Sequence, residues 1–155
     1  DMTTPRAYHA AVSLADGRVL IVAGNGPGAD HPALDSVEIF DPDSRTFASA
    51  GRLITERAGV NAVVLHDGRV LVAGGTNDDG DPRTIEAFDP RSATSTVVGR
   101  IDPGEDRGNS FSMSATLLGD GSVLLTGGNG VGAARFDPRL ARDATEQSLD
   151  PVAPG

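Results

Sequence analysis

The segment Asp16-Gly-Arg-Val-Leu20 decides the fold, because it recurs as Asp67-Gly-Arg-Val-Leu71 and again as Asp120-Gly-Ser-Val-Leu124. Each copy is followed by a glycine step and then by the tripeptide Phe-Asp-Pro, which begins at Phe40, Phe88 and Phe136. A repeat present three times at this spacing is the signature of one supersecondary unit used repeatedly.

Each unit predicts a β-hairpin. In the first copy, the apolar stretch 7–14 predicts an inner strand and the stretch 18–23 predicts the return strand. Between them, Asp16 and Gly17 are predicted to supply the two left-handed positions of a tight two-residue turn. The return strand ends at a doublet that permits close backbone approach: Gly24-Asn25, Gly74-Gly75 and Gly127-Gly128. We expect Asn25 to adopt the left-handed conformation that Asn tolerates best among residues other than glycine.

A third strand precedes each Phe-Asp-Pro, and an outer fourth strand is predicted at 46–50 and 94–98. The polar segment 139–155 shows no strand alternation, so no outer strand is evident in the third copy. The separation between the Asp-Gly turn and Phe-Asp-Pro falls from 24 to 21 to 16 residues along the chain. The loop after the glycine step must therefore vary in length, as loops on a binding face do.

These features together resemble the kelch repeat, the four-stranded blade of kelch and galactose-oxidase-like β-propellers. The resemblance also includes Arg6 and Arg57, which precede the first strand of their copies. The sequence departs from the kelch pattern where a Trp is usual on the outer strand, because Phe47 and Ser95 stand there. The third copy has three extra residues between Arg107 and its hairpin, which puts the equivalence of Arg107 in doubt.

The resemblance implies an all-β protein of about three four-stranded antiparallel propeller blades, the third lacking an evident outer strand. The chain of 155 residues is interpreted as a single unit, with blades at about 5–51, 56–99 and 107–145 and a tail at 146–155. Three blades cannot close a propeller. Either the chain belongs with the remaining blades of a longer propeller, or two copies form a six-bladed ring, so a homo-oligomer is one expectation.

Composition excludes several classes of partner. The net charge of −9 argues against nucleic acid and anionic membrane surfaces, which both require a positive footprint. The longest apolar run, at 19–23, is too short for membrane insertion. A chain that starts at Asp1 suggests processing or excision from a longer one, and the family resemblance favours an extracellular location.

The candidate binding residues lie just before and within the innermost strands. The resemblance implies that this position opens onto a mouth of the propeller channel, where an arginine fork could contact a carboxylate or a sugar hydroxyl. The structural explanation is that each arginine pairs with an Asp or a backbone carbonyl of a neighbouring blade. Polar and aromatic side chains that follow could line the same mouth or could simply pack. The predicted ligand-binding set is Arg6, Tyr8, His9, Arg57, Asn61, Arg107 and Asn109.

No catalytic or metal-binding constellation stands out in the sequence, and no cofactor is predicted. A copper-radical site of the galactose-oxidase type needs a Tyr–Cys crosslink, whereas this chain has no Cys and one Tyr. The favoured hypothesis is a non-catalytic kelch-type scaffold that binds a protein or a glycan. The alternative is part of a galactose-oxidase-like or other carbohydrate-active enzyme whose catalytic residues lie outside this chain.

Overall fold

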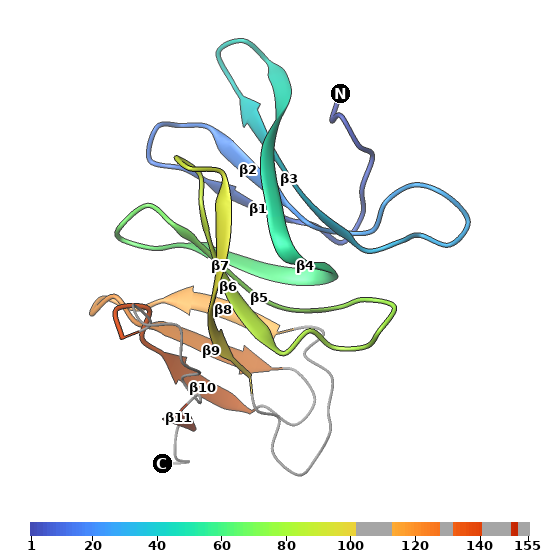
Figure 1. Ribbon diagram of the computed structural model, residues 1–155. Coiled ribbons are helices and arrows are strands. Elements are labelled where there is room, and N and C mark those ends of the chain that lie inside the picture. Colours follow the sequence, from blue (N-terminus) through green and yellow to red (C-terminus); the bar gives the residue numbers. More distant parts are fainter. Residues whose placement is uncertain (102–112, 128–131, 141–149, 152–155) are drawn as a thin grey trace.

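The computed structural model describes residues 1–101, 113–127, 132–140 and 150–151. These residues form antiparallel strands without a helix, which confirms the predicted all-β class (Figure 1). A seven-stranded sheet contains β1 (Ala10–Ser13), β2 (Val19–Val22), β3 (Leu34–Asp41), β4 (Thr46–Val64), β5 (Val70–Thr76), β6 (Thr84–Asp89) and β7 (Thr94–Arg100) in chain order. A four-stranded sheet has the order β11-β10-β9-β8, formed by β8 (Met113–Leu117), β9 (Val123–Gly127), β10 (Ala133–Phe136) and β11 (Asp150–Pro151).

The 19-residue strand β4 divides the larger sheet into two blades. Its first part, from Thr46 to Arg57, pairs with β3, and its second part, from Ala58 to Val64, pairs with β5. Blade 1 is therefore β1, β2, β3 and the first part of β4, and blade 2 is the second part of β4 with β5, β6 and β7. The separate sheet is blade 3. This arrangement confirms three four-stranded antiparallel blades, although β4 continues through the boundary expected at 52–55.

The Asp-Gly hairpins differ from the predicted two-residue turn. In the first hairpin, the backbone N–H of Gly17 donates to the carbonyl of Leu14 at 3.0 Å, and the N–H of Leu14 donates to the carbonyl of Arg18 at 2.8 Å. Gly17 has a φ of +87°, whereas Asp16 is not among the residues with positive φ. The loop thus has three residues, a right-handed turn followed by one left-handed glycine, and the left-handed conformation predicted for Asp16 is wrong.

The glycine step is also shifted by one residue in blade 1. The positive φ angles fall on Ala23 (+60°) and Gly24 (+102°), in the positions of Gly74 (+73°) and Gly75 (+88°), and not on Asn25 as predicted. The step requires glycine because the backbones nearly touch. A Cβ on Gly24 would lie 2.6 Å from the carbonyl oxygen of Ala7, which leaves no room for a side chain.

Blade 3 has an outer strand that the sequence did not reveal. β11 pairs with β10 through two residues, with Asp150 opposite Arg135 and Pro151 opposite Ala134. The third copy thus has an outer strand of two residues, which its sequence does not make evident. Two residues without apolar alternation carry no detectable strand pattern, because that pattern needs at least four residues to be recognised.

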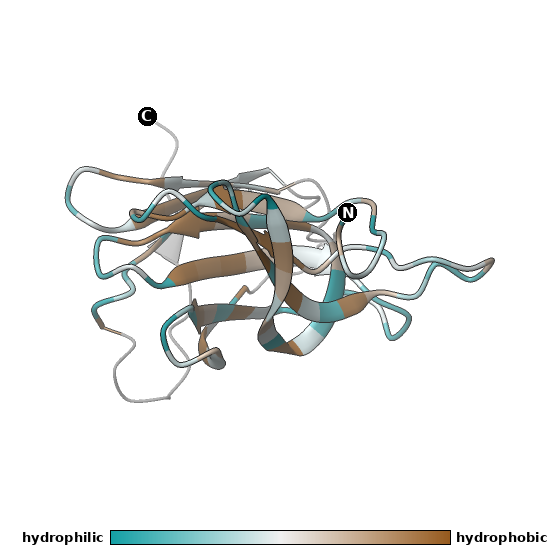
Figure 2. Ribbon diagram, turned by 90° about the horizontal axis from the view of Figure 1, so that it is seen from above, coloured by the Kyte–Doolittle hydropathy of each residue, from teal (hydrophilic) through white to brown (hydrophobic). Residues whose placement is uncertain are grey.

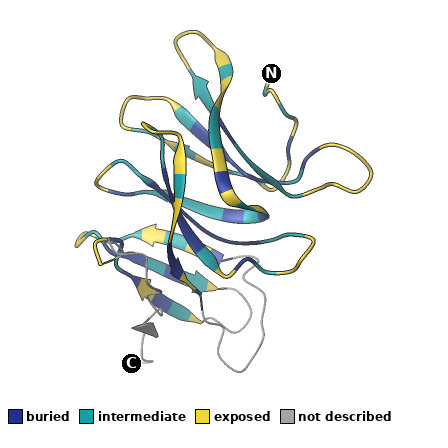
Figure 3. Ribbon diagram, viewed as in Figure 1, coloured by how far each residue is buried: buried dark blue, intermediate teal, exposed yellow. Residues whose placement is uncertain are grey.

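The hydrophobic core lies between the blades as two layers. Strand residues alternate between the two faces of each sheet. One face of blade 2 therefore packs against blade 1 through Val70, Val72 and Phe88, and the other packs against blade 3 through Leu71 and Ile85. Figure 2 shows these hydrophobic strands stacked, with more hydrophilic turns projecting beyond them. The turns and loops are also the most exposed parts of the chain (Figure 3).

Candidate functional site

A buried ion pair sits where blade 1 passes into blade 2. One guanidinium nitrogen of Arg57 donates to the carboxylate of Glu86 at 2.8 Å, and both side chains have no exposed surface. The guanidinium also donates to the carbonyl of Thr84 at 2.9 Å and to its hydroxyl at 2.7 Å. The Glu86 carboxylate in turn accepts the backbone N–H groups of Ile54 and Thr55 at 2.7 and 3.1 Å.

Blade 1 contains the same arrangement. Arg6 donates to Glu38 at 2.5 Å, and the Glu38 carboxylate accepts the N–H groups of Thr3 and Thr4 at 2.8 and 3.0 Å. Arg6 also donates to the carbonyl of Ser36 at 3.0 Å. We call each of these units, an arginine and a glutamate that hold the segment before the arginine, an Arg–Glu clasp. Each clasp fastens the segment leading into a blade to the third strand of that blade.

The third copy lacks both charged residues of the clasp. The clasp arginines lie ten residues before the hairpin aspartate, and Ser110 occupies that position before Asp120. The clasp glutamates lie two residues before the phenylalanine of Phe-Asp-Pro, and Ala134 occupies that position. The arginine and the glutamate are thus replaced together. The predicted site residues Arg107 and Asn109 lie outside the described residues.

Hydrogen bonding dominates the electrostatics of the blade 1 clasp. Burial works against the charged form of Glu38, but the hydrogen bonds from Thr3 and Arg6 outweigh it and hold the pKa of Glu38 below its ordinary value. Burial lowers the pKa of Arg57 in the second clasp, although the nearby Glu86 carboxylate opposes the shift. In both clasps, a positive guanidinium and a negative carboxylate therefore lie in contact inside the fold.

The clasps bear on the ligand-binding role predicted for Arg6 and Arg57. Both arginine side chains are fully buried and direct their guanidinium groups to acceptors within the blade. Both arginines are thus paired inside the fold, as the structural explanation holds, but the charged partner is a glutamate on the third strand of the blade that the arginine precedes, and not an aspartate of a neighbouring blade. A role in binding stays a prediction for these arginines, and their geometry does not favour it.

The remaining predicted residues do not converge on one point. Tyr8 is 66% exposed and has a φ of +55°, while its carbonyl accepts the N–H of Gly59 at 2.9 Å. The Nδ1 atom of His9 is buried without a hydrogen-bond partner among the described residues. The side-chain amide of Asn61 donates to the carbonyl of Met113 and so ties blade 2 to blade 3. Of the predicted residues that the structure describes, Tyr8 alone presents a large surface to solvent.

Tyr8 lies beside the loops of variable length. Its neighbour Ala7 forms a bridge with Asn25, where the loop of blade 1 begins. That loop, at 26–33, and the loop of blade 2, at 77–83, project on the side of the blades opposite the Asp-Gly hairpins (Figure 1). We call this side the loop face and the opposite side the hairpin face. The two described variable loops thus lie on one face.

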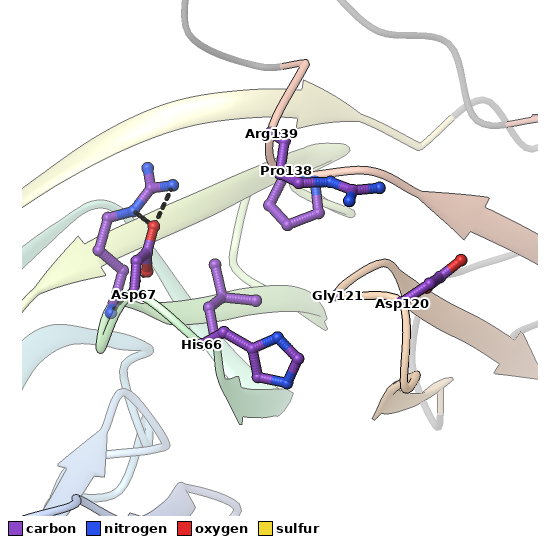
Figure 4. Close-up of a pocket in the computed structure, with 8 residues that line it drawn as sticks. His66, Asp67, Asp120, Gly121, Pro138 and Arg139 are labelled. Carbon is purple, nitrogen blue, oxygen red and sulfur yellow. Dashed lines mark hydrogen bonds and ion pairs between the residues drawn. The ribbon is translucent and has the colours of Figure 1, made fainter.

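Two clefts occur on the hairpin face, each between the hairpins of adjacent blades. The cleft between blades 1 and 2 has a volume of about 300 Å³, and that between blades 2 and 3 has about 210 Å³. Leu65 and His66 line both clefts. Figure 4 shows the second cleft, with His66 and Asp67 of blade 2 facing Asp120 and Gly121 of blade 3. Sequence reasoning missed these clefts, because they form between units and not within one.

The charged groups around the second cleft are paired. Asp67 binds Arg69 at 2.8 Å, Asp137 binds Arg139 at 2.7 Å, and Asp120 binds the side chain of Arg135 at 2.5 Å. Hydrogen bonds from Ser122, together with Arg135, lower the pKa of Asp120 to about 2. Because the acidic and basic side chains around the cleft neutralise one another in pairs, the cleft has little preference for a charged ligand.

No group of three or more His, Cys, Asp or Glu side chains in the described part of the chain is placed to hold a metal ion. Within the same residues, no helix is long and apolar enough to cross a membrane.

The stacked four-stranded blades and their repeated clasps define a protein built on the β-propeller plan. Comparison with known proteins identifies the kind of blade. Residues 61–99 match the family model of the kelch motif. The chain is a kelch-repeat protein.

Two curated relatives are F-box/kelch-repeat proteins of Arabidopsis thaliana. One is 31% identical over 136 residues, which are 87% of this chain and 48% of the relative. The other is 30% identical over 138 residues, which are 89% of this chain and 34% of the relative. The chain thus spans about half the length of the first relative and a third of the second.

Proposed function

We propose that this protein is a non-catalytic interaction scaffold that binds a protein partner through its loop face. One observation carries the proposal: loops of different length project from one side of a repeated rigid frame, beside a tyrosine that is 66% exposed. A tyrosine side chain supplies a large contact area and a hydroxyl at a low cost in conformational entropy, which suits a binding surface. The kelch repeats of the relatives support the same class of function.

The charge of the loop face indicates the chemistry of the partner. The exposed residues of its two described loops include three acids, Asp30, Asp78 and Asp79, and one arginine, Arg83. Arg52 on the adjoining strand is already paired with Asp35 at 2.8 Å. The net charge of the whole chain is also negative. A partner segment with basic side chains around an apolar or aromatic residue would complement this face, because opposite charges steer association and favour the correct partner.

A peptide array with systematic variation in charge would test the proposal, with a glycan array run in parallel. We expect labelled protein to bind basic peptides, and we expect Tyr8→Ala to weaken this binding at least tenfold. His66→Ala is the matched control, because His66 is exposed on the opposite face. Binding to glycans alone would indicate that the partner is a sugar and not a protein. The absence of a signal on both arrays would contradict the scaffold function.

A more specific hypothesis is that two copies of the chain assemble into a six-bladed ring. In such a ring, two blades of different copies would meet at each of the two junctions between the copies. There the side of blade 3 that faces away from blade 2 would pack on the side of blade 1 that faces away from blade 2 in the other copy. The apolar residues Val19 and Phe40 on blade 1 support this pairing, whereas the exposed Arg135 on blade 3 weighs against it. The mass of the particle in solution and its response to variants on each face would test the ring.

A further inference from the structure

Four aspartates of the chain are followed directly by glycine: Asp16, Asp67, Asp79 and Asp120. In such a pair, the backbone nitrogen of the glycine can attack the side-chain carboxyl carbon of the aspartate. The new N–C bond closes a five-membered succinimide ring, and the amide proton leaves with the carboxyl hydroxyl as water. Water then opens the ring at either carbonyl, and opening at the main-chain carbonyl gives isoaspartate, in which the main chain runs through Cβ and Cγ. The four pairs share this chemistry, so the fold decides which of them reacts.

The hairpins of blades 1 and 2 fix their aspartates by hydrogen bonds from the arginine two residues further on. The Asp16 carboxylate accepts the backbone N–H of Arg18 at 3.1 Å and its guanidinium nitrogens at 2.9 and 2.7 Å. The Asp67 carboxylate contacts the same three groups of Arg69 at 3.0, 2.9 and 2.8 Å. Ring closure requires the carboxylate to leave these donors, and hydrogen bonds between charged partners are the stronger kind.

Asp120 is held in the third hairpin through different residues. Its carboxylate accepts the N–H and the hydroxyl of Ser122 at 2.9 and 2.6 Å and the guanidinium of Arg135 at 2.5 Å. The hydrogen bonds from Ser122, together with Arg135, keep the pKa of Asp120 at about 2, and those from Arg18 lower the pKa of Asp16. Because the neutral acid is the form that a nitrogen attacks, a carboxylate kept ionised resists ring closure.

Asp79 lies in the exposed loop between β5 and β6 and has none of these contacts (Figure 3). Asn77 and Gly80 exchange two backbone hydrogen bonds of 2.8 and 3.1 Å around it, and its own N–H donates to the Asn77 side chain at 3.1 Å. Across the described residues, no group is hydrogen-bonded or ion-paired to the Asp79 carboxylate. A Cβ placed on Gly80 would have nothing within 4 Å, so the turn is open on that side. The Asp79 carboxyl group is thus free to rotate towards the Gly80 nitrogen.

The glycine nitrogens do not distinguish the four pairs. Each donates to a backbone carbonyl, at 3.0 Å from Gly17, Gly68 and Gly121 and at 3.1 Å from Gly80. Ring closure breaks this hydrogen bond in every pair at a similar cost. The state of the carboxylate is therefore what sets Asp79 apart from the aspartates of the hairpins.

Asn25-Gly26 offers the related reaction, in which ammonia leaves in place of water. Here Asn25 forms β-bridges with Ala7 and Ala33, so the backbone of the pair is held on both sides. Gly26 is also buried. This environment opposes the rotation that ring closure needs. The pair Asn129-Gly130 lies outside the described residues.

We propose that Asp79-Gly80 is a site of covalent modification, at which Asp79 converts to isoaspartate in the folded protein while the three hairpin aspartates are protected. Conversion adds one methylene group to the main chain within the turn and leaves the former main-chain carbonyl as a free carboxylate. The two hydrogen bonds between Asn77 and Gly80 would no longer both fit, so the loop face changes shape as the protein ages. This inference rests on the geometry of the turn and does not depend on the loop face binding a partner.

Peptide mapping of the folded chain after incubation at neutral pH and physiological temperature tests the site. Cleavage after arginine places Asp16, Asp67 and Asp79 in separate peptides. Isoaspartate shifts the chromatographic retention of a peptide without changing its mass, and fragmentation assigns its position. We expect isoaspartate to form at Asp79 about tenfold faster than at Asp16 or Asp67, because hydrogen bonds to a charged group contribute roughly that factor. In urea, where the fold is lost, the three sites should react at comparable rates.

Arg18→Gln removes the guanidinium from Asp16 and is the complementary variant. Arg18 is exposed, so the variant should keep its fold, which circular dichroism would verify. We expect Asp16 to react several times faster in this variant, while Asp67, still paired with Arg69, reacts as in the wild-type chain. Equal rates at the three sites in the folded chain would overturn the proposal, as would a preference for Asp79 that persists in urea. A folded Arg18→Gln chain in which Asp16 stays as unreactive as before would overturn it too.

Discussion

Arg57 and Glu86 form an ion pair at 2.8 Å in which neither side chain has any exposed surface. The carboxylate also accepts the N–H groups of Ile54 and Thr55 and the hydroxyl of Ser95, which lies 2.7 Å away. This geometry differs from that of a surface ion pair, because the charges are removed from water and depend on each other. Breaking such a pair by removing one partner leaves an uncompensated buried charge.

Arg57→Met should therefore lower the free energy of unfolding by about 3–5 kcal/mol, since Glu86 would be left buried without its cation. The double variant Arg57→Met with Glu86→Leu should be less destabilised than the two single changes predict together. Urea unfolding of all three variants measures this coupling. Arg52→Met is the control, because the Arg52 side chain is 72% exposed in its pair with Asp35, and it should change stability by less than about 1 kcal/mol. Additive single changes would contradict the clasp.

Gly24→Ala should destabilise the protein strongly, because the new Cβ would lie 2.6 Å from the Ala7 carbonyl oxygen. Gly28→Ala provides a matched control. Gly28 also has a positive φ, +114°, but an added Cβ would have nothing within 4 Å. The difference in thermal unfolding between the two variants isolates the effect of close backbone approach from that of φ, and equal shifts would show that the contact is unimportant.

Acid should weaken the blade 1 clasp. Because the pKa of Glu38 is lowered in the folded state, its contribution to stability is present above the unfolded-state pKa and is lost as the pH falls through the folded-state value. Glu38→Gln should therefore show a smaller loss of unfolding free energy between pH 7 and an acidic pH than the wild-type chain. Glu56→Gln, at an exposed position, should retain the wild-type dependence. Identical pH profiles for wild type and Glu38→Gln would refute this role.

Asn61→Ala should loosen the junction between blades 2 and 3. The Asn61 amide is hydrogen-bonded to the carbonyl of Met113, and a carbonyl left without its donor costs about 1–3 kcal/mol where it is buried. The smaller side chain itself fits the strand, because Ala10 has the equivalent position in blade 1. Hydrogen exchange should accelerate in β8 and β9 more than in β2 and β3. Uniform acceleration across the blades would indicate a general loss of stability instead.

The sequence predicts the strands well because apolar periodicity and turn chemistry act locally. The repeated Asp-Gly and Phe-Asp-Pro signals mark where each strand begins or ends, and the observed strands lie at those positions. The conformations of Asp16 and Asn25 were predicted incorrectly. Two-residue and three-residue hairpins share the same Asp-Gly signal, and the close contact that fixes the glycine step involves residues distant in sequence.

The clasp glutamates were missed for a different reason. Glu38 and Glu86 alternate with apolar residues on their strands, a pattern that ordinarily indicates a solvent-facing side chain. The two copies that have an arginine ten residues before the hairpin aspartate also have a glutamate two residues before the phenylalanine. This recurrence was the available signal. Their joint replacement by Ser110 and Ala134 in the third copy strengthens it. The clefts on the hairpin face arise from the stacking of blades and have no local pattern.

The passage of β4 through two blades bears on how such an array can lengthen during evolution. Ile54 and Thr55 lie near the end of the first part of β4, which belongs to blade 1. Their N–H groups donate to Glu86 of blade 2. A duplicated segment cut at the visible edges of a sheet would separate that glutamate from its donors. A segment cut within β4, before Ile54, would keep Arg57, Glu86 and the two N–H donors of the carboxylate in one piece. The segment that keeps its buried charges paired is therefore offset along the chain from the blade seen in the fold.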